Sequence, residues 1–419
     1  MADTARADVG RRDRMVCLVH SVGFGMLHVG LLPGLTKPLE QAYFLTHGQM
    51  GTLLAMGAGL SCAAAIVLGA VADRRGASPI LSMSMVVIAA SAFAIWQAKS
   101  TVGGIAALLI FHFAAGSYFV ANGLVFALYG AGHAGGLNLF HGLQGIGRLL
   151  APLVIVAATL VTGTWRTVFL MSFLVHLGLA FLYLNVHEPP HPEGQKPIAF
   201  SGILEALLNR RYIACLAVFV FVSGCEISMI TWVANYLERE AGFVQAQALL
   251  GLTIMMSGYT GIRLVLGFTR IEVGIRFMAA ALALNIASYV LLMFVVRHVL
   301  TAYAVCFLLG ASFGPFWPCA ASLLLRRLRG GRGLLSGVFG VGSALGAIIS
   351  LSVVGWLGDC FSLRAALVVT PVSAAIFVAI YRALFLGTPG DVESDGLSGE
   401  ARRTSLDTGR ADAVRREIF

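Results

Sequence analysis

The chain has 419 residues, of which 58% are hydrophobic and only 12% are charged, with a formal net charge of +9. A soluble protein of this length carries about twice that fraction of charged residues, so the composition excludes an ordinary soluble protein. It predicts an all-α integral membrane protein, and the 49 glycines suit helices that pack closely in lipid. The seven cysteines are scattered without paired spacing, so we expect no metal site, disulfide or cofactor.

Twelve apolar spans, each long enough to cross a bilayer as a helix, follow one another along the chain. We place them at 15–36, 48–72, 79–98, 102–128, 138–162, 166–186, 212–237, 245–268, 274–296, 299–325, 335–357 and 363–386. The domain organisation that follows is an N-terminal segment (1–14), a six-helix bundle (15–186), a linker (187–211), a second six-helix bundle (212–386) and a tail (387–419).

The two segments outside the bundles have different compositions. Prolines in the linker cannot continue a helix, and its stretch FSGILEALLN (200–209) is short and amphipathic, so we expect it to lie along the membrane surface. The tail is polar and mixed in charge, and we expect it to be disordered.

Lysine and arginine are distributed unevenly between the two sides of the membrane. With twelve spans both termini share one side, and 21 of the 29 basic residues fall on that side against six on the other. The positive-inside rule therefore places both termini in the cytoplasm of a bacterial-type inner membrane. Because topology accounts for the basic charge, we expect the lipid bilayer, and no nucleic acid, as a partner.

Short motifs recur between the two halves. GLQGIG (142–147) and GVFGVG (337–342) share glycines at the same internal spacing, 195 residues apart. Gly69 and Gly76 match Gly267 and Gly274 at an offset of 198, as Trp165-Arg166 matches Leu363-Arg364. Three matches in order at nearly one offset predict duplicated, pseudo-symmetric six-helix halves, an architecture of many secondary transporters.

The stretch GAVADRRGAS (69–78) puts charges between the second and third spans. Gly69 permits close helix contact, Asp73 suits the backbone donors at the N-terminus of a neighbouring helix, and Arg74 holds the loop in the cytoplasm. An ordinary positive-inside loop is the alternative interpretation. With Gly76, the stretch resembles the loop signature of the major facilitator superfamily, Gly-x-Leu-Ala-Asp-Arg-x-Gly-Arg-Lys, although Ala77 and Ser78 replace its last basic residues.

This resemblance implies a twelve-helix transporter over about residues 15–386, in which Asp73 gates the outward-facing state against the helix at 335–357. The stretches GCEISMITWVANYLERE (224–240) and GASFGPFWPCAASLLLRRL (310–328) are similar to the fucose/glucose-type sugar porter group. The acidic residues of that group in helices one and four are absent here. GLQGIGRLLAP (142–152) lacks the spacing of the antiporter signature, which counts against drug:proton exchange.

Ionisable residues at bilayer depth are costly and therefore candidates for function. Glu226 lies near the midplane of the seventh span with no basic residue within two helical turns, so its partner must come from another helix. Because an apolar environment favours the protonated carboxyl group, we expect Glu226 to carry the coupling proton. His28 lies 198 residues earlier, and the repeat places it across the same cavity as a substrate contact or relay. Alternatively, Glu226 caps a neighbouring helix and His28 is a core residue.

Two arginines lie inside predicted spans. Arg148, near the middle of the fifth span, would bind a carboxylate or phosphate through two hydrogen bonds, or form a structural ion pair. Arg263, in the eighth span, matches a stretch common in the family, and the resemblance to monocarboxylate porters implies contact with the substrate anion. Its position near the cytoplasmic end would also let it reach the membrane surface. Further polar side chains could line a cavity or simply pack: Asn122, Gln144, Trp232, Asn235, Tyr236 and Trp317.

These observations predict a monomeric secondary transporter that moves a small polar solute by alternating access, coupled to protons. The two intramembrane arginines favour an organic anion, while sugar:proton symport and drug or metabolite efflux remain alternatives. We expect no enzyme, because the chain shows no Ser/His/Asp set, metal-ligand spacing or phosphate loop. A transport-inactive sensor on the same fold would need a large extra domain, and the central linker and the tail are short.

Overall fold

The computed structural model describes residues 2–129, 134–188, 210–269, 274–327 and 332–386. In the N-terminal half the elements are α1 (Ala2–Phe24), η1 (Gly25–Val29), α2 (Leu31–Tyr43), α3 (His47–Arg75), α4 (Ala77–Gln97), α5 (Thr101–Ala115), α6 (Tyr118–Tyr129), α7 (Ala134–Thr162) and α8 (Thr167–Tyr183). In the C-terminal half they are α10 (Arg210–Arg239), α11 (Gln245–Thr269), α12 (Ile275–Val290), η2 (Leu291–Val295), α13 (Val299–Phe313), α14 (Phe316–Arg327), α15 (Arg332–Cys360), α16 (Leu363–Ala366) and α17 (Val369–Leu386).

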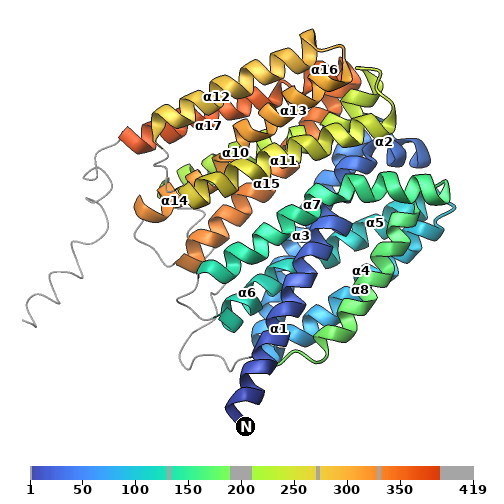
Figure 1. Cartoon of the computed structure of the whole chain (residues 1–419), viewed down its shortest axis with the longest axis vertical. Coiled ribbons are helices and arrows are strands. Elements are labelled where there is room, and N and C mark those ends of the chain that lie inside the picture. Colours follow the sequence, from blue (N-terminus) through green and yellow to red (C-terminus); the bar gives the residue numbers. More distant parts are fainter. Residues whose placement is uncertain (1, 130–133, 189–209, 270–273, 328–331, 387–419) are drawn as a thin grey trace, which may run out of the picture.

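The predicted all-helical membrane fold is confirmed. Eleven helices in the described ranges are long and apolar enough to cross a membrane, and Thr167–Tyr183 is a shorter apolar helix. Figure 1 shows two bundles of long helices, one for each half of the chain. The surface segment expected at 200–209 and the tail expected from 387 lie outside the described residues.

The first span differs from its prediction in length and regularity. It runs from Gly10 to Tyr43, beyond the predicted end at residue 36, and includes Pro38. It is interrupted at η1, a π-helical turn closed by a 2.9 Å hydrogen bond from the Gly30 amide to the Gly25 carbonyl. Such turns are rare and frequently lie at functional sites. Charged residues at the end of α2 remain helical because they contact the other half, as described below.

The internal repeat is visible in the packing within each half. A Cβ added at Gly116 would lie 2.3 Å from the Ser61 carbonyl oxygen, and one at Gly314 would lie 2.7 Å from the Tyr259 carbonyl oxygen. Gly314 and Tyr259 lie 198 residues after Gly116 and Ser61, respectively, so the two contacts are equivalent under the repeat. Gly147 and Gly342, 195 residues apart, similarly approach the backbones of α1 and α10. Equivalent glycines therefore bring equivalent helix pairs into contact in each half.

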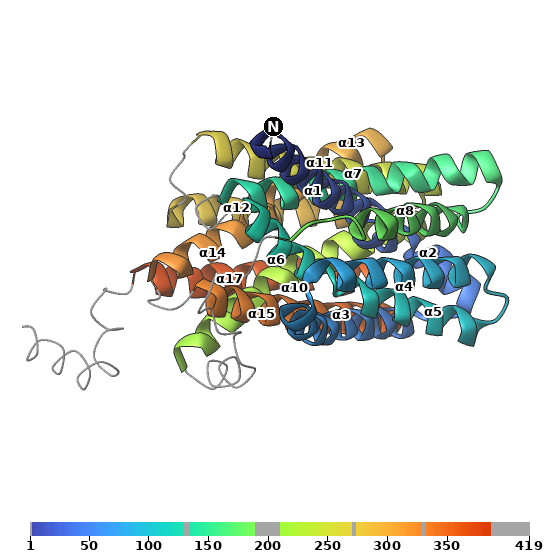
Figure 2. The same ribbon diagram turned by 90° about the horizontal axis from the view of Figure 1, so that it is seen from below.

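The halves meet along two helix pairs that the repeat relates to one another. Helix α3 packs along α15, and α7 packs along α11. The first pair lies side by side in both Figure 1 and Figure 2. A Cβ at Gly51 would lie 2.2 Å from the Leu351 carbonyl oxygen, so the backbones of α3 and α15 are in direct contact. Because these helices come from different halves, any relative motion of the halves must separate or slide them.

Candidate functional site

The central site is built around Glu226, in the middle of α10. Its carboxylate forms a 3.0 Å ion pair with the Arg263 guanidinium and accepts a 2.8 Å hydrogen bond from the Tyr259 hydroxyl. Both partners lie on α11 and are one helical turn apart. The Arg263 guanidinium lies 3.9 Å from the centre of the Tyr259 ring and donates a 2.6 Å bond to the Gly314 carbonyl. Glu226 is 7% exposed and the Arg263 side chain is 32% exposed, so a buried carboxylate is paired with a half-buried guanidinium.

The two arginines predicted to bind substrate differ in their interaction partners. Arg263 donates hydrogen bonds to Glu226 and Gly314 and lies over the Tyr259 ring. Arg148, on α7, interacts electrostatically with Glu226 and Tyr259 but makes no hydrogen bond or ion pair within the described ranges, and its Nε is buried without a partner. The site thus combines one paired and one unpaired guanidinium around a single carboxylate.

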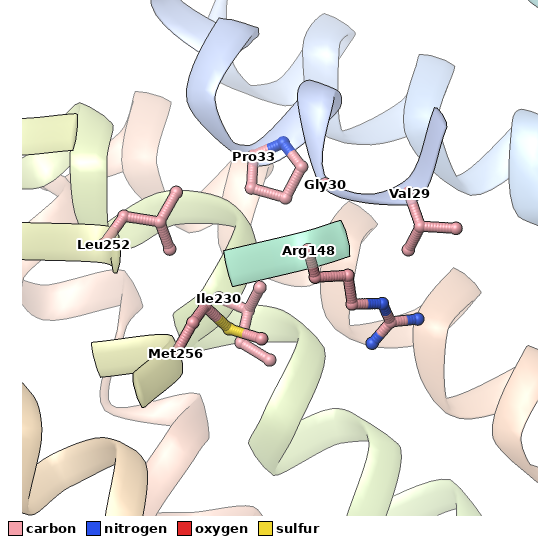
Figure 3. Close-up of a pocket in the computed structure, with 7 residues that line it drawn as sticks. All are labelled: Val29, Gly30, Pro33, Arg148, Ile230, Leu252 and Met256. Atoms are coloured by element: carbon pink, nitrogen blue, oxygen red, sulfur yellow. The ribbon is translucent and has the colours of Figure 1, made fainter. Parts of the chain in front are cut away.

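Arg148 borders a pocket between the halves. Figure 3 shows it at the meeting point of helices from both halves. All other lining residues are apolar or glycine: Val29, Gly30, Pro33, Ile230, Leu252 and Met256. Ile230 lies four residues after Glu226 on α10, so the pocket continues from the ion-pair site by about one helical turn.

His28 lies in the π-helical turn, within the N-terminal half. It is 5% exposed, stacks between Phe24 and Phe111 at ring-centre distances of 4.9 and 4.6 Å, and meets His112 edge-on at 5.2 Å. Neither of its ring nitrogens has a hydrogen-bond partner. It interacts electrostatically with Arg148, which brings it within range of the central site without direct contact.

The structure does not bring the remaining predicted residues together at one site. Gln144 lies three residues after His141 on α7, the helix of Arg148. Half-buried Asn122 has a buried amide oxygen without a partner, and Trp317 donates a 3.2 Å bond to the Ser343 hydroxyl. Trp232 and Asn235 lie in the C-terminal half of α10, beyond Glu226. The Trp232 ring meets the His47 ring edge-on at 5.8 Å, and Asn235 donates to the Glu40 carboxylate. Tyr236 donates to the Leu292 carbonyl within its own half.

Sequence analysis missed a buried charge cluster at the end of the bundle opposite the start of α1. Glu40 on α2 is 2% exposed and forms a 2.7 Å ion pair with Arg239 of the other half. The same carboxylate accepts bonds of 3.2 Å from Asn235 and lies 2.7 Å from His47 Nδ1. We call this group, with the contacts of the next paragraph, the far-end latch. The sequence signal for this cluster was Glu40 itself, but the first span was predicted to end at residue 36, which placed Glu40 in a loop.

Two further contacts complete the far-end latch. Lys37 and Glu238 form a 2.7 Å ion pair between α2 and α10. Under the 198-residue offset Lys37 corresponds to Asn235 and Glu238 to Glu40, so this pair and the Asn235–Glu40 contact are equivalent. The Asp359 carboxylate of α15 accepts bonds from the Thr46 hydroxyl (2.6 Å) and from the first amides of α3, His47 and Gly48 (2.8 Å each). Within the described ranges, every ion pair and hydrogen bond between the halves lies at this end.

At the opposite end, the loop 69–78 has an acidic partner that was not predicted. Gly76 has a positive φ of 90° and separates α3 from α4. The Glu188 carboxylate accepts hydrogen bonds from the first amides of α4, Ala77 (2.8 Å) and Ser78. Arg74 is exposed, and no atom lies within 4 Å of a Cβ built at Gly69, so that glycine permits no close contact here. The side chain of Asp73 lies outside the described part of the chain.

The arrangement suits binding and ion exchange. Among the described residues, no group of three or more histidine, cysteine or acidic side chains could hold a metal ion. A buried carboxylate that contacts a tyrosine and an arginine can either form an ion pair as the anion or carry a proton as the neutral acid. An unpaired guanidinium can bind an anion through two parallel hydrogen bonds. Both lie where the two halves meet.

Comparison with known proteins agrees with this architecture. The model of the Major Facilitator Superfamily matches residues 16–329. A bacterial homolog of the human lysosomal transporter Spinster, in an inward-facing conformation, superposes with a TM-score of 0.73 at 16% identity, covering 91% of this chain and 98% of that one. A D-xylose-proton symporter gives 0.70 at 16% identity (90% and 98%), and the E. coli fucose:proton symporter 0.61 at 17% (90% and 98%). A search of curated proteins found no match. The family model and the helical architecture together show that the chain belongs to the major facilitator superfamily.

Proposed function

We propose that this protein is a monomeric, proton-coupled transporter of an organic anion in the inner membrane, with both termini in the cytoplasm. The observation that carries the proposal is the central site, in which the Arg148 guanidinium is unpaired while Arg263 is held by Glu226. An unpaired guanidinium that borders a cavity between two mobile halves is suited to a carboxylate from outside the protein.

Proton coupling follows from competition for Arg263. While Glu226 is ionised, its carboxylate occupies the Arg263 guanidinium at 3.0 Å. Protonation removes the charge of Glu226, weakens the ion pair and makes Arg263 available to a substrate anion next to Arg148. An anion and a proton therefore enter the site together, and each favours binding of the other because the two events are thermodynamically linked.

The far-end latch supports an assignment of the conformation. With the termini in the cytoplasm, the latch lies on the periplasmic side and holds the halves together there. The structure then corresponds to a state that is closed to the periplasm, and the transport cycle requires the latch to break. His28, which has no partner for its ring nitrogens, serves as a proton relay or substrate contact on the N-terminal side of the site.

The test is uptake of radiolabelled carboxylates by proteoliposomes with and without a pH gradient. We expect wild-type protein to concentrate the anion only under the gradient. Glu226→Gln should abolish accumulation but keep exchange of labelled for unlabelled anion, since exchange needs no net proton movement. Arg148→Gln should abolish both, and Arg148→Lys, which keeps the charge, should retain part of the exchange. If accumulation of the anion is the same with and without the pH gradient, and the same in Glu226→Gln as in the wild type, the proposal of proton coupling is wrong.

A sugar:proton symporter is the second candidate. It is favoured by the similar folds of the xylose- and fucose-proton symporters and by the polar side chains of Gln144 and Asn122 in the same half as Arg148. The same proteoliposomes distinguish the two: uptake of a neutral sugar that survives Arg148→Gln would favour symport of sugar.

A further inference from the structure

We propose that the transported anion passes between the central site and the cytoplasm along an entry face formed by His141 and Arg148 of α7 and Arg263 of α11. This inference rests on the proposed anion transport and names its cytoplasmic route. The observation that carries it is the position of His141, an exposed residue two helical turns from Arg148 on the same face of α7. Because the charges of the entry face sum to a positive value, it favours anions over cations.

His141 is exposed to the gap between the halves and not to lipid. Seven residues of α-helix cover about 10.5 Å and nearly two full turns, so His141 and Arg148 share one face of α7. A Cβ at Gly145, between them on this face, would lie 3.9 Å from a side chain of α11 in the other half. The exposed apolar residues Ile146 and Leu150 lie about 140° and 180° around the helix from His141. The lipid-facing side of α7 is therefore opposite His141.

His141 lies on the cytoplasmic side of Arg148. It precedes Arg148 on α7, at the level where the Ser21 hydroxyl of α1 donates a hydrogen bond to the Phe140 carbonyl. The His141 ring meets the Tyr118 and Phe140 rings edge-on, at ring-centre distances of 6.1 and 5.7 Å. The ion pairs and hydrogen bonds that join the halves in the described ranges lie at the other end, in the far-end latch. With the periplasmic side closed, the gap beside His141 is the route from the central site to the cytoplasm.

The entry face has an excess of positive charge. His141 interacts electrostatically with Arg148 of its own half and with Arg263 of the other half. The Glu226 carboxylate pairs with Arg263 at 3.0 Å, and no described acidic side chain forms an ion pair with Arg148 or His141. Two guanidinium groups and one carboxylate leave one uncompensated positive charge even when His141 is neutral. Protonation of Glu226 leaves two, so the attraction for an anion increases in the state that binds substrate.

The experiment measures the modification of a cysteine at position 141 by reagents of opposite charge. His141→Cys is made in a Cys360→Ser background, because Cys360 is an exposed free thiol, and is studied in inverted membrane vesicles whose cytoplasmic face is outside. The probes are the anionic 2-sulfonatoethyl and the cationic 2-(trimethylammonium)ethyl methanethiosulfonates. Each rate is divided by the rate of the same reagent with free 2-mercaptoethanol. In about 10 mM salt, we expect the anionic reagent to be favoured by about fourfold, because Arg148 lies about 10.5 Å away.

Variants and salt locate the effect. Arg148→Gln should reduce the preference to about onefold, whereas Arg148→Lys, which keeps the charge, should retain it. Ile146→Cys, a 46% exposed position on the lipid-facing side of the same helix, should react with neither reagent. If Arg148→Gln does not fold, salt decides the question on His141→Cys alone. About 1 M salt reduces the Debye length to about 3 Å and should remove the preference.

The outcomes separate this inference from the proposed function. An unreactive His141→Cys would overturn the entry face, and so would a preference that is absent or that persists in Arg148→Gln or in 1 M salt. Modification of Ile146→Cys as fast as His141→Cys would overturn the assignment of the two sides of α7. None of these results alters carboxylate uptake by proteoliposomes. Conversely, if no carboxylate is taken up, the proposed function is wrong, and the role of the entry face in transport is overturned with it.

Discussion

Glu40 is the residue whose change should most directly alter which side of the protein is open. Its carboxylate joins the halves through Arg239 at 2.7 Å and Asn235 at 3.2 Å, and it is 2% exposed. Glu40→Gln keeps the size of the side chain and removes its charge. The ion pair with Arg239 exists only when the halves are together. Its loss therefore destabilises the state that is closed at the far end and leaves the open state unaffected.

The expected magnitude follows from the burial of the pair. Breaking a fully buried ion pair costs about 3–5 kcal/mol, whereas an exposed pair contributes about 0–1 kcal/mol. The Arg239 side chain is 34% exposed, so water partly compensates its lost partner. We therefore expect a cost of about 2 kcal/mol, which is a shift of about 30-fold in the equilibrium between the two states. If about 1% of wild-type molecules are open at the far end, about a quarter of the variant molecules should be.

The assay is double electron–electron resonance between spin labels at the far end. Phe44→Cys and Val244→Cys provide labelling sites at loop positions that are 87% and 62% exposed, one in each half, in a Cys360→Ser background because Cys360 is an exposed free thiol. The variant should show a larger population at long distance than the labelled parent protein.

Lys37→Gln is the matched control. It breaks an ion pair between the same two helices, but in that pair the carboxylate is 15% exposed, against 1% for the Glu40 side chain. We expect a shift of less than about fivefold. Distance distributions of Glu40→Gln that equal those of the parent, or that move no further than those of Lys37→Gln, would refute the reasoning.

Two other predictions concern the backbone contacts. Gly51→Val should also open the far end, because a Cβ there would lie 2.2 Å from the Leu351 carbonyl oxygen. Gly59→Val on the same helix should not, because the nearest atom to its Cβ would be 3.7 Å away. The same spin-label distances measure the effect of both substitutions. Glu188→Ala should remove both acceptors at the start of α4, with a cost of about 1 kcal/mol and a fall of about 2–4 °C in the thermal unfolding midpoint. Glu188→Gln, which keeps one acceptor, should fall less, and equal stability of all three proteins would show that the cap contributes nothing.

The fold was predictable because each element of it is encoded locally. A membrane span requires about twenty apolar residues in a row, and the chain contains such rows with clear polar breaks between them. The repeat was also readable, since equivalent glycines must stay small wherever helices touch. The structure extends that pattern to Gly116 and Gly314, which were not part of the original comparison.

The site was less predictable because its interactions join residues that are far apart in the chain. Glu226 was expected to have a partner on another helix, but which helix could not be derived from one sequence; the partner, Arg263, was assigned to the substrate instead. Glu40 was left out because charges near the end of an apolar run usually mark a loop. Here Lys37 and Glu40 stay helical because they meet opposite charges some 200 residues away.

The π-helical turn Gly25–Val29 makes the first span sensitive to length. An α-helix turns by about 100° per residue, and a π-helical turn shifts the angular phase of everything that follows it. Before the turn, His20 faces Tyr183 of its own half at 2.7 Å; after it, Glu40 faces Arg239 of the other half. Deleting one residue within 25–29 would rotate the part of the span that follows the turn, α2, while leaving the composition of α2 intact. Homologous chains in this span should therefore exchange residue types more freely than they gain or lose residues.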